Sequence, residues 1–158
     1  MKITLCGSIA FYNEMLAAQK QLEELGHEVR LPPHEIPGPD GRPMAVADYY
    51  KLRKESGDDA AWVWDQKERS MRAHFDKVIW SDIIVVTNYE KRGIKGYIGA
   101  NTLMEMGLAC HLQKPIYLMF EIPDLDYREE ILGMKPQIVS DFTQIYNQPQ
   151  KFFVMASE

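Results

Sequence analysis

The chain has 158 residues, of which 46% are hydrophobic and 26% are charged. This balance excludes wholesale disorder and predicts one domain over residues 1–158. No apolar run reaches the roughly 18 residues of a membrane helix, and the N-terminal segment is too short for a signal peptide. The net charge of -5 argues against binding a nucleic acid polymer, but not against a local basic pocket. The two cysteines make no disulfide framework, so we expect a cytoplasmic protein that binds no membrane.

The first half of the chain alternates short apolar runs with segments of helical periodicity. We predict strands at 2–6 and 27–31 and helices at 11–25, 45–54 and 60–80. In the last of these helices, Trp64, Met71, Phe75 and Val78 are expected on one face. The segment 32–43 holds five prolines and two glycines, and this density predicts a loop without regular structure.

The second half continues the same alternation. The β-branched run 82–87 is typical of a central parallel strand that is covered on both faces. A loop follows at 88–99, and then come a helix at 101–112 with Asn101 or Thr102 as its N-cap, a strand at 116–120, a helix at 127–134, a strand at 137–139, a helical turn at 141–146 and an edge segment at 152–154. The alternation predicts an α/β protein with an open, mostly parallel sheet.

Ligands of such sheets bind beyond the carboxyl ends of the strands, where the strand order reverses. This rule selects the turn after the first strand, where Gly7 permits close approach to the backbone and Ser8 adds a hydroxyl group. With the free N–H groups of the next helix, the turn suits a phosphate or a sugar hydroxyl. The alternative is a plain turn with a helix cap, and the turn is not a P-loop.

Glu105 is the strongest catalytic candidate. It lies about one turn into the helix that follows the glycine-rich loop, among apolar residues. The helix dipole can keep a carboxylate at this position ionised, and such a carboxylate can attack an anomeric carbon or stabilise an oxocarbenium ion. The alternative is an acid that satisfies the helix N-terminus, although an exposed capping acid rarely lies in so apolar a run.

Four motifs, in this order, resemble the nucleoside 2-deoxyribosyltransferase superfamily, which includes deoxynucleoside 5′-monophosphate N-glycosidases and CMP hydrolases. They are Cys6-Gly7-Ser8-Ile9, Ser81-Asp82-Ile83-Ile84-Val85-Val86, Gly99-x-x-x-x-Met104-Glu105-Met106-Gly107 and Lys114-Pro115-Ile116. The resemblance implies a flavodoxin-like, doubly wound sheet of five mostly parallel strands with helices on both faces, and a homodimer or an assembly of dimers. It also implies that Glu105 is the nucleophile and that Gly7, Ser8 and Ile9 contact the sugar or the 5′-phosphate.

Two positions depart from the superfamily pattern. Relatives often carry an aspartate eight residues before the one that opens the third strand, and counting back from Asp82 leads to His74. This imidazole could protonate the departing base, pair with the nucleophile or cap the helix. Gly99 stands where some relatives place a polar side chain, so contacts to a substrate there must come from backbone amides or from Asn101.

The remaining candidates are polar residues near the same loops. Asn88 ends the third strand and could hydrogen-bond a sugar or a base, although a turn residue is the favoured alternative. His27, His34 and His111 have no metal-ligand spacing, so we predict no metal site. The expected chemistry requires no cofactor.

Residues and resemblance together predict cleavage or transfer of the N-glycosidic bond of a nucleoside or a nucleoside 5′-monophosphate. Glu105 would attack C1′, and His74 or water would protonate the base. One alternative is a phosphoribohydrolase of the cytokinin-activating type, because the segment Asn101-Thr102-Leu103-Met104-Glu105 resembles its G-T-x-x-E motif. The other is a non-catalytic protein that binds or senses nucleotides.

Overall fold

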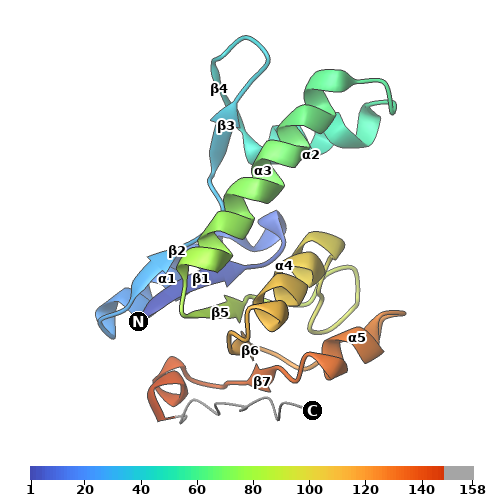
Figure 1. The fold of residues 1–158 in the computed structure, drawn as a ribbon. Coiled ribbons are helices and arrows are strands. Elements are labelled where there is room, and N and C mark those ends of the chain that lie inside the picture. Colours follow the sequence, from blue (N-terminus) through green and yellow to red (C-terminus); the bar gives the residue numbers. More distant parts are fainter. Residues whose placement is uncertain (148–158) are drawn as a thin grey trace, which may run out of the picture.

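A computed structural model describes residues 1–147 and shows a five-stranded sheet between two layers of helices (Figure 1). The strands of the sheet are β1 (Lys2–Cys6), β2 (Glu28–Arg30), β5 (Ile83–Val86), β6 (Ile116–Leu118) and β7 (Gln137–Ile138). The helices are α1 (Tyr12–Glu24), α2 (Val46–Glu55), α3 (Ala61–Trp80), α4 (Ala100–His111) and α5 (Arg128–Gly133), with 3-10 helices η1 (Ile9–Phe11) and η2 (Phe142–Asn147). The predicted edge segment at 152–154 lies outside the described residues.

The strand order places the reversal point of the sheet between β1 and β5. The order is β2-β1-β5-β6-β7, and every pairing in this sheet is parallel. Ile3 of β1 lies opposite Val29 on one side and opposite Ile83 on the other. The chain therefore builds outward from β1 in one direction and then returns to build in the other, which is the flavodoxin-like order. The predicted fold class is confirmed.

Side chains of the central strands alternate between two apolar layers, as the period of a strand requires. Ile3, Leu5, Ile83 and Val85 pack with α1 and η2 on one face. Cys6, Ile84 and Val86 pack on the other face with Val78 of α3, Met106 of α4 and Ile131 of α5. Both faces are covered, so the β-branched run of β5 is buried at each of its four residues. None of the helices in the described part of the chain combines the length and the apolar character that a membrane span needs.

The prediction of an unstructured loop at 32–43 was wrong. Strands β3 (Glu35–Pro37) and β4 (Pro43–Ala45) form an antiparallel hairpin, which stands apart from the main sheet beside α2 (Figure 1). Proline is tolerated here because each strand of a two-stranded ribbon has a free edge that needs no N–H donor. Gly41, with φ of 79°, closes the turn, and its N–H donates to the carbonyl of Gly38 at 3.0 Å.

The buried face of α3 also differs from the predicted one. Its fully buried residues are Val63, Gln66, His74 and Val78, whereas Trp64, Met71 and Phe75 are only partly buried. The predicted face was wrong because it was drawn from the large apolar residues of the whole helix. The outer half of α3 extends beyond the sheet and packs on α2 and the hairpin. His74 therefore lies on the buried face, four residues before Val78.

Candidate active site

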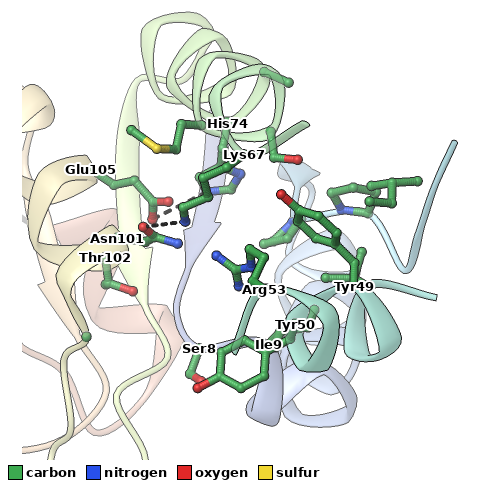
Figure 2. A pocket seen from close by; sticks show the side chains of 18 of the residues that line it. Ser8, Ile9, Tyr49, Tyr50, Arg53, Lys67, His74, Asn101, Thr102 and Glu105 are labelled. Atoms are coloured by element: carbon green, nitrogen blue, oxygen red, sulfur yellow. Dashed lines mark hydrogen bonds and ion pairs between the residues drawn. The ribbon is translucent and has the colours of Figure 1, made fainter. Parts of the chain in front are cut away.

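A cavity of about 650 Å³ opens beyond the carboxyl end of β1, where the strand order reverses (Figure 2). The turn after β1, helices α2, α3 and α4, and the β3–β4 hairpin all contribute to its wall. It brings together most of the residues that the sequence selected, namely Gly7, Ser8, Ile9, His74, Gly99, Asn101 and Glu105. The predicted loops and helix start therefore do converge on one site.

Asn88 does not join this group, and its proposed contact with a substrate is corrected. Its side chain is fully buried, and its Oδ1 accepts hydrogen bonds from the N–H groups of Met119 and Phe120, each at 3.0 Å. Its Nδ2 donates to the carbonyls of Phe120 and Glu121, each at 3.1 Å. The amide is thus occupied in joining β5 to the loop after β6, which is the structural role of a strand-ending residue.

The turn after β1 is shaped by close packing and carries a cation. A Cβ atom added to Gly7 would lie 2.2 Å from Thr87 Oγ1, so only glycine fits. Ser8 accepts a hydrogen bond from the Ala10 N–H at 3.3 Å and caps η1. Lys91, from the loop after β5, donates from Nζ to Ser8 Oγ at 2.8 Å. A hydroxyl group and an ammonium group therefore meet at the cavity edge, a pairing that suits a phosphate.

The N-terminus of α4 is built differently from the expectation. Gly99 is the N-cap, with φ of -84° and ψ of 171°, and the helix begins at Ala100, so neither Asn101 nor Thr102 is the cap. Gly99 offers no side-chain cap, which leaves the first N–H groups of the helix to other partners. Asn101, in the first turn, accepts a hydrogen bond at Oδ1 from Lys67 Nζ of α3 at 2.8 Å.

Glu105 and His74 face each other across the α3–α4 contact. His74 Nε2 lies 3.6 Å from Glu105 Oε2, and both side chains are about nine-tenths buried. No side chain among the described residues hydrogen-bonds the His74 ring, which interacts with the backbone of Leu5. Behind them, the Cys6 thiol at the end of β1 hydrogen-bonds the Glu105 carboxyl group. Nothing in the sequence pattern predicted this contact of Cys6.

Burial dominates the acid–base properties of this group. It raises the pKa of Glu105 to about 8, against the opposing effects of the Cys6 hydrogen bond and of Lys67 and Lys77. Burial, assisted by Lys77, lowers the pKa of His74 to about 4. Loss of solvation is the largest effect on the imidazole. Both shifts favour the uncharged forms of the pair, a protonated Glu105 and a neutral His74.

The cavity also gathers residues that the sequence analysis did not select. Tyr49, Tyr50 and Arg53 come from α2, and Lys67 and Lys77 come from α3. A signal for the α3 residues was present, because Lys67, Ser70, His74 and Lys77 recur at spacings of three and four residues and so form a polar row on one side of the helix. The α2 residues had no comparable signal, since their approach to the site depends on the hairpin.

Cys6, His74 and Glu105 also form a group that has the composition of a metal site. One potential ligand atom from each lies within 4.8 Å of the others, and no other such group occurs among the described residues. The ammonium groups of Lys67 and Lys77 act on the same carboxyl group and would repel a cation there. The electrostatic setting thus favours acid–base chemistry at Glu105 over metal binding.

No family model matches the chain, and no curated protein matches it by sequence. Among solved structures, it is similar to the 2-deoxyribosyltransferase of the psychrotolerant bacterium Bacillus psychrosaccharolyticus, with a TM-score of 0.55 over 94% of this chain and 93% of that chain. The chain has the fold of a 2-deoxyribosyltransferase. The Clostridium botulinum CMP N-glycosidase BcmB is also similar, with a TM-score of 0.47 over 88% of this chain and 86% of that chain. Each is 16% identical to this chain in sequence, and the likeness to the 2-deoxyribosyltransferase is one of fold.

Proposed function

We propose that this protein cleaves or transfers the N-glycosidic bond of a nucleoside or a nucleoside 5′-monophosphate, with Glu105 as the nucleophile. The observation that carries the proposal is the buried Glu105 carboxyl group, which lines a 650 Å³ cavity and lies 3.6 Å from an imidazole. A carboxylate of this kind can form a covalent bond to C1′ as the base leaves. The 2-deoxyribosyltransferase fold and the superfamily motifs support the same chemistry.

The Glu105–His74 pair can supply both groups that this reaction needs. A nucleophile must be ionised, and a departing base must receive a proton. Transfer of the shared proton from Glu105 to His74 creates a carboxylate and an imidazolium in one step. Positive charge that develops at C1′ as the base leaves would stabilise the carboxylate, and transfer of the proton to the departing base removes the charge from His74.

The reaction then proceeds in two displacements. Glu105 attacks C1′ as the bond to the base breaks, and the base leaves with the bond electrons and takes the proton from His74. The neutral imidazole next accepts a proton from water or from an acceptor base, which attacks C1′ and releases the Glu105 carboxylate. Ser8 and Lys91 meet at the edge of the cavity and are suited to hold a hydroxyl group of the sugar during both steps.

The test is to incubate the protein with a panel of nucleosides and 5′-monophosphates and to measure the released free base by chromatography. Glu105→Ala should lower base release by several orders of magnitude, because the nucleophile is lost. Glu129→Ala, which removes an exposed acid on α5, is the matched control and should leave the rate unchanged. More than about one tenth of the wild-type activity in the Glu105→Ala variant would exclude this residue as nucleophile. Ligand binding by the wild-type protein without base release would instead indicate a nucleotide-binding protein.

The role of His74 is tested through the pH dependence of base release. One shared proton predicts a bell-shaped profile, with an acidic limb near pH 4 and an alkaline limb near pH 8. His74→Gln should remove the acidic limb and lower the maximum, whereas His74→Asp should retain measurable activity by restoring the superfamily's carboxylate. If His74→Ala leaves rate and profile unchanged, the proton comes from water or from the substrate.

A further inference from the structure

The cavity wall is far more cationic than the chain as a whole. Six cationic and two acidic side chains line it, although the chain carries a net charge of -5. The cations are Arg53, Lys54, Lys67, Arg69, Lys77 and Lys91, and the acids are Glu35 and Glu105. An excess of like charge in a concave site destabilises the empty protein and attracts a ligand of opposite charge.

Arg53 is held in place without a counter-ion. Its guanidinium group lies 5.1 Å from the centre of the Tyr49 ring and 5.2 Å from that of Tyr50. Its Nε is buried and has no hydrogen-bond partner, and no carboxylate among residues 1–147 forms an ion pair with it. Buried donors are rarely left unused in proteins, and a guanidinium that stacks on aromatic rings is preorganised for an oxyanion.

Lys67 brings a second positive charge to the same region. Figure 2 shows Arg53 and Lys67 projecting into the pocket from α2 and α3. Burial, together with the charges of Arg53 and Lys54, lowers the pKa of Lys67 to about 8, against the opposing effect of Glu105. The Lys67 ammonium group donates to Asn101 Oδ1, an uncharged acceptor, at 2.8 Å. Two cations are thus held within range of each other's charge by neutral partners.

We propose that Arg53 and Lys67 together bind a phosphate-type oxyanion, at a site distinct from the Ser8–Lys91 pair. The guanidinium group can donate hydrogen bonds to two oxygens of a tetrahedral oxyanion, and the ammonium group can donate to a third. Two sources supply this chemistry, a phosphate group carried by a nucleotide substrate and free inorganic phosphate. The site itself does not depend on the proposed function, but the choice between these two sources does.

Calorimetric titration with inorganic phosphate tests the site itself. The variants Arg53→Gln and Lys67→Gln should each weaken binding by about tenfold or more, as expected when a charged hydrogen-bond partner is lost. Lys51→Gln is the matched control, because Lys51 lies on α2 two residues before Arg53, is exposed and pairs with Asp48. Its affinity for phosphate should equal that of the wild type.

Two further variants control for misfolding and for phosphate binding at Ser8. Arg53→Lys keeps the charge and much of the stacked stem, so it should fold as the wild type does and lose only part of the affinity. Lys91→Gln removes the cation at Ser8 and should leave the Arg53–Lys67 site intact. Wild-type phosphate affinity in both Arg53→Gln and Lys67→Gln, or no binding by the wild type at millimolar phosphate, would overturn the proposal.

The source of the oxyanion is distinguished with Glu105→Gln, which cannot turn over a substrate. If the substrate's phosphate occupies the site, inorganic phosphate will compete with a 5′-monophosphate, and Arg53→Gln will weaken the monophosphate but not its parent nucleoside. If free phosphate occupies it, phosphate and monophosphate will bind together. Both results support the site. If the wild-type protein releases no base, the proposed function is wrong, but the result of the phosphate titration is unaffected.

Discussion

Replacing Glu105 by glutamine is expected to make the folded protein more stable at neutral and alkaline pH. Glutamine has nearly the same shape, can still hydrogen-bond Cys6 and never ionises. The wild-type carboxyl group, in contrast, must either keep its proton or place a charge in the interior, where solvation is lost. The test requires no substrate, so it is independent of the proposed activity.

The magnitude follows from the two pKa values of Glu105. In the unfolded chain the carboxyl group ionises near its ordinary pKa of 4.5, whereas the folded protein retains the proton to about pH 8. The folded state binds more protons between these values, so its stability falls as the pH rises through this window. Each pH unit is worth about 1.4 kcal/mol, which gives a penalty of about 1 kcal/mol at pH 5, about 3 kcal/mol at pH 7 and about 4 to 5 kcal/mol above pH 8.

Urea unfolding of both proteins at pH 5, 7 and 8.5 measures this penalty. The difference in unfolding free energy should grow in favour of Glu105→Gln across the series, whatever constant offset the amide introduces. Glu129→Gln, at an exposed position on α5, is the matched control for removing a carboxylate. A difference between Glu105→Gln and wild type that stays constant from pH 5 to pH 8.5 would refute the inferred burial of this acid.

Two other predictions rest on the structure, and a third, on the oligomeric state, rests on the family resemblance. Cys6→Ala removes the hydrogen bond that lowers the pKa of Glu105, so the alkaline limb of the base-release profile should move to higher pH; an unmoved limb would mean that the thiol has no influence on it. Gly7→Ala places a Cβ 2.2 Å from Thr87 Oγ1 and should lower the unfolding free energy by about 1 to 3 kcal/mol, whereas Gly107→Ala, which meets no atom within 4 Å, should not lower it. A homodimer or an assembly of dimers should appear by light scattering at tens of micromolar, and a monomer mass would contradict it.

The sheet could be predicted because its strands carry an unambiguous pattern. Four consecutive buried residues in β5, Ile83–Val86, fit only a strand that is covered on both faces. Glu105 could be selected for a related reason, since a carboxyl group in an apolar helix has few ordinary roles. The resemblance singled out His74 and left its pairing with Glu105 as one of three possible roles. The structure places the two side chains together.

The cationic side of the cavity could not be predicted, because its residues lie far apart in the chain. Arg53 reaches the site only through the placement of α2, which depends on the hairpin between Glu35 and Ala45. The prolines of that hairpin concealed it, since they are typical of loops. The burial of His74 was missed because Trp64 and Phe75 were taken to mark the inner face of α3, while half of that helix faces a different core.

That second core means that two different parts of the chain form the ligand-binding wall and the catalytic wall of the cavity. Ile36, Tyr49 and Val63 form a small apolar cluster of their own, which joins the hairpin and α2 to the outer end of α3. Glu105 and Cys6 belong instead to the frame of the sheet. Exchange or remodelling of the segment between β2 and α3 can therefore change which ligand is admitted while the bond-breaking carboxyl group keeps its setting. In this architecture, new specificities can arise by variation in one contiguous stretch of sequence.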